Sequence, residues 1–181
     1  MNDSTLSQKL IEVLVDSSSL ILLYKAHLLP ALCSHYRPVI ASEVFREVTQ
    51  NNKPGADECY RRIRDKEIIV LPHITKPLHP DLKAHTTMGA GELKTLHHAL
   101  SGTASFIIID DLQAIRYCIR KNIPFINALL VPRILALAGA VPYARSHHDF
   151  ATLCKTGHYS SGIIKKANIL GSEELRQFFP F

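Results

Sequence analysis

The chain has 181 residues, of which 46% are hydrophobic and 20% are charged, and its formal net charge is +5. This length and composition predict one globular domain with a sizeable core, and two domains would be cramped. The basic charge favours an anionic partner, and nucleic acid is the simplest such partner.

Three simple classes of protein are disfavoured by the sequence. No apolar stretch approaches the roughly 20 residues that a membrane-spanning helix needs. The polar first residues are unlike a signal peptide, so we expect a soluble, unprocessed, cytoplasmic protein. The four cysteines lie far apart without paired spacing, which predicts reduced thiols and disfavours a zinc site or a disulfide framework.

The first informative segment joins an apolar run to a helical pattern. Residues 13–15 are typical of a buried strand, and apolar residues then recur at helical spacing up to Pro30, where we expect the helix to stop. Asp16 lies between the two, so it is predicted at the carboxyl end of a strand, the edge where open α/β sheets bind ligands. Asp16, or a serine after it, is also suited to capping the helix, and the sequence leaves both roles open.

Four more short apolar runs are predicted as strands. They comprise residues 38–41, 68–71, 105–109 and 124–127. Helical patterns separate these runs, and three short helices are expected over residues 148–154, 160–168 and 173–179. Strands alternating with helices predict an α/β three-layer sandwich with a mostly parallel central sheet of about five strands. We predict a single domain over residues 1–181, in which residues 143–181 form a short helical C-terminal extension packed on the sandwich.

Two other stretches carry expectations. Residues 72–88 are predicted as the longest loop, and three of their histidines could touch a substrate. These are His73, His79 and His85. Arg61, Arg62 and Arg64 are expected on a solvated helix face, which is the usual place for such a run of charges.

Carboxylates recur at the ends of the predicted strands. Asp16 and the pair Asp110 and Asp111 each follow a strand, while Glu47 and Glu92 are expected near the starts of two helices. All five acids are therefore predicted on one edge of the sheet. Crowded carboxylates raise one another's pKa unless a cation compensates them. Oxygen ligands without histidine or cysteine favour Mg²⁺ or Mn²⁺ over Zn²⁺, and in a basic protein they predict metal-assisted hydrolysis of a phosphodiester.

These segments resemble the motifs of the PIN-domain ribonucleases. Residues 13–18 are similar to the first strand of that family and its first acid, at Asp16. Residues 38–48 are similar to its second motif, in which the acid aligns with Glu47. The resemblance therefore begins with the segment that the apolar pattern singles out.

Two later segments continue the resemblance in the family's order. Residues 89–93 resemble a Gly-x-Gly-Glu motif that places the third acid at Glu92. Residues 107–111 resemble the strand that presents the fourth acid, mapped to Asp111, with Asp110 as a further acid. Many members carry Thr or Ser two residues before the fourth acid, whereas this chain has isoleucine there.

The resemblance implies a Mg²⁺- or Mn²⁺-dependent endoribonuclease that cleaves single-stranded RNA. The implied catalytic acids are Asp16, Glu47, Glu92 and Asp111, and the implied metal ligands are Asp16, Glu92, Asp110 and Asp111. Ser17 or Ser18, beside Asp16, could supply a supporting hydroxyl. The resemblance to the toxin-like branch of small stand-alone prokaryotic PIN proteins also implies the toxin of a toxin–antitoxin pair, a small antitoxin protein as partner, and a homodimer.

Other classes of protein fit the sequence less well. A non-catalytic PIN-like module that binds RNA or a protein is the main alternative, and missing acids would favour it, but none is missing. A phosphatase with an aspartyl nucleophile needs a second aspartate where this chain has Ser18. The phosphate-binding motif of P-loop NTPases does not occur.

Overall fold

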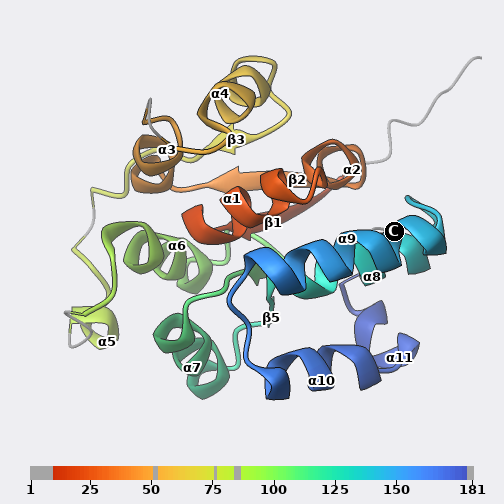
Figure 1. The fold of residues 1–181 in the computed structure, drawn as a ribbon. Helices are drawn as coiled ribbons and strands as arrows, with labels where there is room; N and C mark the ends of the chain where they lie inside the picture. Colours follow the sequence, from red (N-terminus) through yellow and green to blue (C-terminus); the bar gives the residue numbers. More distant parts are fainter. Residues whose placement is uncertain (1–9, 51–52, 76, 84–86, 179–181) are drawn as a thin grey trace, which may run out of the picture.

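The computed structural model describes residues 10–50, 53–75, 77–83 and 87–178. A sheet of five strands lies at its centre (Figure 1). The strands are β1 (Ile11–Val15), β2 (Tyr36–Ile40), β3 (Ile69–Val70), β4 (Phe106–Ile108) and β5 (Phe125–Ile126). Neighbouring strands are all parallel, in the order β3-β2-β1-β4-β5. The predicted α/β fold with a mostly parallel sheet is therefore confirmed.

Helices connect the strands and flank the sheet. They are α1 (Ser17–Lys25), α2 (Leu29–His35), α3 (Ser42–Val48), α4 (Ala56–Arg64), α5 (Pro80–Lys83), α6 (Ala90–Leu100), α7 (Leu112–Lys121), the 3₁₀ helix η1 (Ala128–Leu130), α8 (Val131–Leu137), α9 (Tyr143–Thr156), α10 (Ser161–Ile169) and α11 (Ser172–Arg176). The predicted long loop over residues 72–88 thus contains α5. His85, one of its three histidines, lies outside the described residues.

Two apolar cores lie on the two faces of the sheet. Successive residues of a strand point to opposite faces, and Val13 and Val15 belong to a core that also contains residues of α1, α2, α3, α8 and α9. Leu14 belongs to the other core, together with residues of α5, α6 and α7. Both faces of β1 are therefore buried over residues 13–15, which explains why these three residues form a continuous apolar run.

The order of the strands places a switch point between β1 and β4. The chain adds β2 and β3 on one side of β1 and then returns to add β4 and β5 on the other side. In such sheets, ligands bind in the crevice outside the carboxyl ends of the two strands at the switch point. Val15 lies opposite Ile108, so Asp16 and Asp110 follow these two strands at neighbouring positions on that edge.

The helices after β5 pack close to α8. α9 lies along α8 and also contacts α1, and α10 and α11 lie below α8 and α9 in Figure 1. Leu153 of α9, Ala167 of α10 and Leu175 of α11 are buried in the same core as Val13. The core on this face of the sheet thus extends into the C-terminal helices.

Helix α9 is longer than the predicted helix over residues 148–154. It begins at Tyr143 and has 14 residues. Ser146 and Asp149 occupy buried positions on its inner face. A helix is recognised in a sequence by apolar residues at helical spacing on its buried face. Here polar residues occupy such buried positions, so the apolar pattern is weak over the first two turns of α9.

Pro30 does not end the first helix as predicted. α1 ends at Lys25, His27 has a left-handed backbone (φ 56°), and Pro30 lies in the first turn of α2. Proline is favoured at this position because the N–H that it lacks would have no partner within the helix. The same residue type therefore starts a helix here instead of stopping one.

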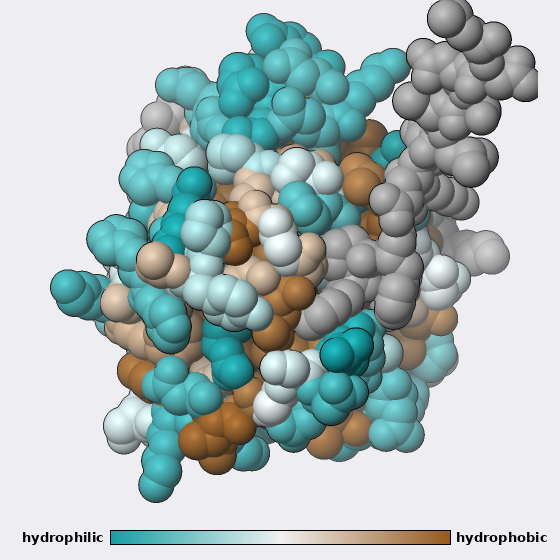
Figure 2. All heavy atoms as spheres, turned by 90° about the vertical axis from the view of Figure 1, so that its right-hand side faces the viewer, coloured by the Kyte–Doolittle hydropathy of each residue, from teal (hydrophilic) through white to brown (hydrophobic). Residues whose placement is uncertain are grey.

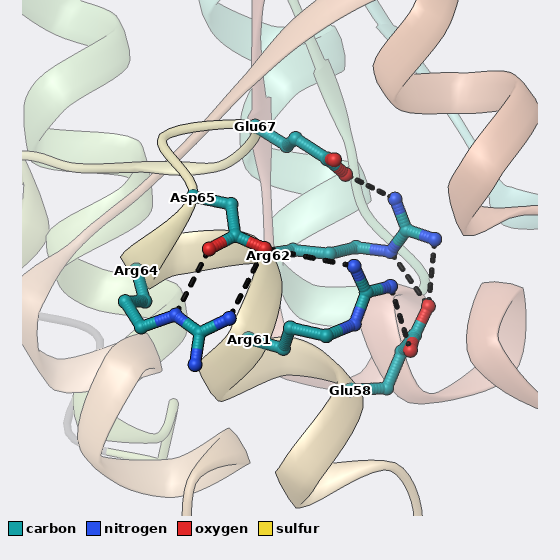
Figure 3. Close-up of polar contacts among 6 residues, drawn as sticks. All are labelled: Glu58, Arg61, Arg62, Arg64, Asp65 and Glu67. Atoms are coloured by element: carbon teal, nitrogen blue, oxygen red, sulfur yellow. Dashed lines mark hydrogen bonds and ion pairs between the residues drawn. The ribbon is translucent and has the colours of Figure 1, made fainter.

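Arg62 is buried, contrary to the predicted solvated face. Its guanidinium lies between Glu58, with 2.6 Å between Nη2 and Oε1, and Glu67 (Figure 3). Its side chain is 7% exposed, whereas those of Arg61 and Arg64 are 44% and 66% exposed. The prediction is correct for Arg61 and Arg64, and the charge of Arg62 is compensated within the fold.

The surface is mostly polar. On the face in Figure 2, hydrophilic residues dominate the upper part, and apolar residues form smaller groups between polar ones. The exposed large apolar residues are Tyr60, Leu112, Ile119, Tyr143, Ile163 and Ile169. No helix within the described ranges has the length and apolar character to cross a membrane. All four cysteines are free thiols, as predicted.

Candidate active site

Asp16 both ends a strand and caps a helix, so the two roles that the sequence leaves open coexist. Its backbone N–H donates to Ile108 O at 3.2 Å, which extends the β1–β4 pairing by one residue. Its Oδ1 accepts from the N–H of Ser19 at 2.8 Å, and its Oδ2 accepts from the Ser18 hydroxyl at 2.7 Å. The side chain is fully buried. Among the described residues, the Ser18 hydroxyl donates such a bond to Asp16 and the Ser17 hydroxyl does not.

Asp110 is held by three donors from three parts of the chain. Its Oδ2 accepts from the Ser19 hydroxyl at 2.7 Å and from the N–H of Ala128 at 3.2 Å. Its Oδ1 accepts from the Tyr159 hydroxyl at 2.6 Å. Ser19 therefore links the two aspartates, because its N–H binds Asp16 and its hydroxyl binds Asp110. Neither Ser19 nor Tyr159 is among the residues predicted from the sequence.

The residue before Asp110 offers no hydroxyl group. Ile109, at the position where the sequence resemblance leads one to expect Thr or Ser, is fully buried in the core on the α6 and α7 face. No hydroxyl is available at that position. In this chain Ser19 brings a hydroxyl to the neighbouring acid from α1 instead.

Burial and mutual repulsion shift the titration of this pair. Burial and, to a lesser extent, the charge of Asp110 raise the pKa of Asp16 to about 7, although the hydrogen bonds from Ser19 and Ser18 oppose the shift. Burial also raises the pKa of Asp110, although Ser19, Tyr159 and Ala128 stabilise its ionised form. Two acids that are difficult to ionise at neighbouring positions are typical of a functional site.

The other three acids form a second group near the first turns of α6 and α7. Asp111 caps α7 by accepting from the N–H of Ala114 at 2.8 Å. Burial raises the pKa of Glu92, and the charges of Glu47 and Asp111 raise it too. These three carboxylates therefore lie near enough to repel one another.

Glu47 contacts the start of α6 through a glycine. It lies in the last turn of α3, not near the start of the helix as predicted, because α3 ends at Val48. Its Oε1 accepts from the N–H of Gly91 at 3.1 Å. A Cβ at Gly91 would lie 2.7 Å from Oε2 of Glu47. The second glycine of the Gly-x-Gly-Glu segment, Gly91, thus allows the close approach of this carboxylate.

The five acids lack cationic partners within the described ranges. None of them forms an ion pair with a lysine, arginine or histidine there. The acids form a pair, in which Asp16 is buried and Asp110 half-buried, and a half-buried trio. No three or more of the His, Cys, Asp and Glu residues described are close enough to hold one ion together. One further oxygen, Oδ1 of Asn127 after β5, is buried without a hydrogen-bond partner.

A basic cluster gathers around Glu43, from α3, α6 and the loop after β3. Arg46 and His73 contact the carboxylate of Glu43 at 3.3 and 3.1 Å. Burial raises the pKa of Glu43, but the Ser42 hydroxyl and the charges of Lys94 and His73 outweigh it, so the pKa is lowered. Cationic groups thus surround a single acid here, close to Glu92 on the same helix as Lys94.

The comparisons with known proteins agree with this fold. A family model described as the PIN domain matches residues 12–161, which include the sheet and all five acids. Searches of the curated proteins and of the solved structures gave no match. The matched range covers most of the chain, from β1 to the start of α10. The chain therefore belongs to the PIN-domain family.

Proposed function

We propose that this PIN-domain protein is a divalent-metal-dependent endoribonuclease that hydrolyses phosphodiester bonds of single-stranded RNA. The observation that carries the proposal is the set of five acids at the carboxyl edge of the sheet, uncompensated by any cation among the described residues. Keeping such a set in a folded protein is costly unless a cation binds it. A metal ion that also contacts a phosphodiester gives the set a chemical use.

The proposed ligands are Asp16, Glu92, Asp110 and Asp111, and Glu47 completes the catalytic set. Their oxygens suit Mg²⁺ or Mn²⁺, which bind carboxylates and retain several waters. The buried oxygen of Asn127, which lacks a donor, supports the presence of a cation nearby. A bound ion would lower the pKa of an attacking water and stabilise charge on the phosphate. Ser18 and Ser19 contribute by fixing the orientation of the two buried carboxylates.

The basic cluster supports RNA as the substrate. Arg46 and His73 are exposed at Glu43, and Arg46 precedes Glu47 of the acidic trio on α3. Lysine and arginine next to a metal site are suited to bind the phosphates that flank the cleaved bond. Base-specific contacts in single-stranded RNA would come from the surrounding loops.

The test is cleavage of labelled single-stranded RNA in Mn²⁺ and in chelator. Wild type should cleave only with metal, and Asp111→Asn, purified in parallel, should lose the activity. Asparagine also caps helices well, so this variant should keep α7 intact while removing one charge. Asp57→Asn, on the exposed start of α4, is the matched control and should cleave like wild type. Metal-dependent RNA binding without cleavage would favour the non-catalytic module instead.

A second variant should move Glu47 without changing its charge. Gly91→Ala introduces a methyl group against the Glu47 carboxylate, whose flexible side chain can swing away. We expect Mn²⁺ affinity to fall by about 10-fold, as for other supporting changes around a metal, with little loss of thermal stability. Gly162→Ala in α10 is the control, because a Cβ there meets only Ser160 Oγ at 4.0 Å. Equal Mn²⁺ affinity in both variants would show that Glu47 does not contribute to the metal site.

The biological role proposed for this activity rests on the sequence resemblance to the toxin-like branch. In that role the chain is the toxin of a toxin–antitoxin pair, forms a homodimer, and binds a small antitoxin protein. A neighbouring gene for such a protein, and growth arrest on expression that this gene relieves, would support the role. Harmless expression without such a neighbour would favour RNA processing.

A further inference from the structure

We infer that Tyr159 is a positioning residue for Asp110, so that the turn between α9 and α10 is part of the active site. The inference rests on the proposed function, because it assigns Tyr159 a role in holding a metal ligand. No motif in the sequence points to this residue. It follows from the contacts of one hydroxyl group.

Tyr159 completes the set of donors around Asp110. Its hydroxyl donates to Oδ1 at 2.6 Å, while Ser19 and Ala128 donate to Oδ2. Each carboxylate oxygen has two lone pairs, so both lone pairs of Oδ2 are used and one of Oδ1 remains. With donors on both oxygens, the carboxylate cannot rotate freely. The remaining lone pair of Oδ1 therefore has a defined direction.

The direction of this hydrogen bond follows from the two groups. A tyrosine hydroxyl can donate a proton, whereas an ionised carboxylate can only accept one. The Tyr159 hydroxyl therefore donates to Asp110, and it is half-buried beside the same segment, at the start of η1, whose Ala128 N–H donates to the other oxygen of Asp110.

The backbone before Tyr159 has an unusual conformation that brings the ring to this place. His158 has a left-handed backbone (φ 48°), which few side chains favour. A Cβ at Gly157 would collide with the Tyr159 ring and would lie 2.9 Å from Leu153 O. The ring packs against the core on the α8 and α9 face. The turn therefore accommodates a ring folded back toward the sheet, with its hydroxyl on Asp110.

Uncharged hydrogen-bond donors, instead of a cation, stabilise the Asp110 carboxylate. Asp110 lies beside Asp16 without a cation among the described residues, so three neutral donors do the work that an arginine or lysine does elsewhere. A lysine or arginine in their place would compete with a metal ion for the carboxylate. Neutral donors stabilise the ionised carboxylate and leave its charge available to the ion.

The experiment compares Mn²⁺ binding by calorimetry in wild type, Tyr159→Phe and Tyr143→Phe. Tyr159→Phe removes only the hydroxyl, and the Kd for Mn²⁺ should rise about 10-fold or more, the usual cost of losing a group that orients a ligand. Tyr143 is exposed at the start of α9, so Tyr143→Phe should bind like wild type. In the Asp110→Asn background, Tyr159→Phe should cause no further loss, because the carboxylate that it positions is gone.

Melting curves in chelator separate positioning from a purely structural role. A lower Tm for Tyr159→Phe with an unchanged Kd for Mn²⁺ would overturn the inference alone. Wild type that binds no Mn²⁺ and cleaves no RNA would overturn the proposed function and the inference with it. If Tyr159→Phe does not fold, Gly157→Ala provides a second test, since it displaces the ring and keeps the hydroxyl. Unchanged Mn²⁺ affinity in a folded Gly157→Ala protein would also overturn the inference.

Discussion

Asp16→Asn is expected to unfold at a higher temperature than wild type at pH 8 in the presence of chelator. The substitution removes a fully buried charge next to Asp110, whose charge adds to the shift that burial imposes on Asp16. Asparagine keeps an oxygen for the N–H of Ser19, so the cap of α1 is retained. Since each pKa unit corresponds to about 1.4 kcal/mol, the gain in unfolding free energy is on the order of 4 kcal/mol at most.

The gain should depend on pH in a direction fixed by the pKa shift. The pKa of Asp16 is about 7 in the folded state and 3.8 in the unfolded reference, so the folded state binds the proton more tightly. Wild type should therefore lose stability as the pH rises from about 4 toward 7, and the advantage of Asp16→Asn should shrink to nothing below this range. Melting curves between pH 4 and pH 8 test this, with Asp57→Asn as an exposed control. A lower Tm for Asp16→Asn at pH 8 would show that the carboxylate is stabilising there.

Adding Mn²⁺ or Mg²⁺ to wild type at neutral pH should raise its Tm. An ion that binds only the folded state stabilises it by about 2.7 kcal/mol at a free concentration 100 times its Kd. The ion also relieves repulsion between Asp16 and Asp110, and between Glu92 and its two acidic neighbours.

Two variants make this test specific. Asp16→Asn should begin at a higher Tm in chelator and gain less from the ion. Asp57→Asn should gain as much as wild type, because its side chain is exposed on α4. Differential scanning fluorimetry in chelator and over a series of Mn²⁺ concentrations measures these shifts in Tm. Equal rises in Tm for wild type and Asp16→Asn would show that the ion binds away from Asp16.

Much of the fold follows from local patterns in the sequence. Residues 13–15 of β1 and the whole of β4 are continuous apolar runs because both of their faces are buried, and each strand ends on aspartates that cap the next helix. Such a junction is recognisable because a strand, a carboxylate and a helix are all adjacent along the chain. The edge position of Asp16, Asp110 and Asp111 could therefore be predicted without coordinates.

Some local predictions failed because one residue type has two uses. Pro30 starts α2, although proline stops helices equally well. Arg62 is buried, although charge runs are usually solvated, because Glu58 and Glu67 lie on both sides of it. The spacing of residues along the chain does not show which residues will be their neighbours in the fold, and these neighbours decide both cases.

The donors around Asp110 show which site residues cannot be predicted from sequence patterns. One contact of Ser19 could be predicted from the sequence, because a helix cap at Asp16 requires a donor N–H three residues later. The contact of its hydroxyl with Asp110, 91 positions away, could not be predicted from any sequence pattern. Tyr159 lies 49 positions from Asp110, and only the packing of the C-terminal helices brings its hydroxyl to the sheet. Residues that orient a ligand through space leave no spacing pattern in the chain.

The separation of these donors also sets the order in which a newly made chain can complete the site. Chains emerge from the ribosome with the N-terminus first, so Asp16, Ser19 and Asp110 are available before the residues that follow α9. Asp110 cannot acquire its third donor until Tyr159 has been synthesised and has folded back onto the sheet. A nascent chain that already contains every acid of the site thus lacks one of its supports until the segment after α9 has been made. The acids are therefore all synthesised before the site has its full set of hydrogen-bond donors.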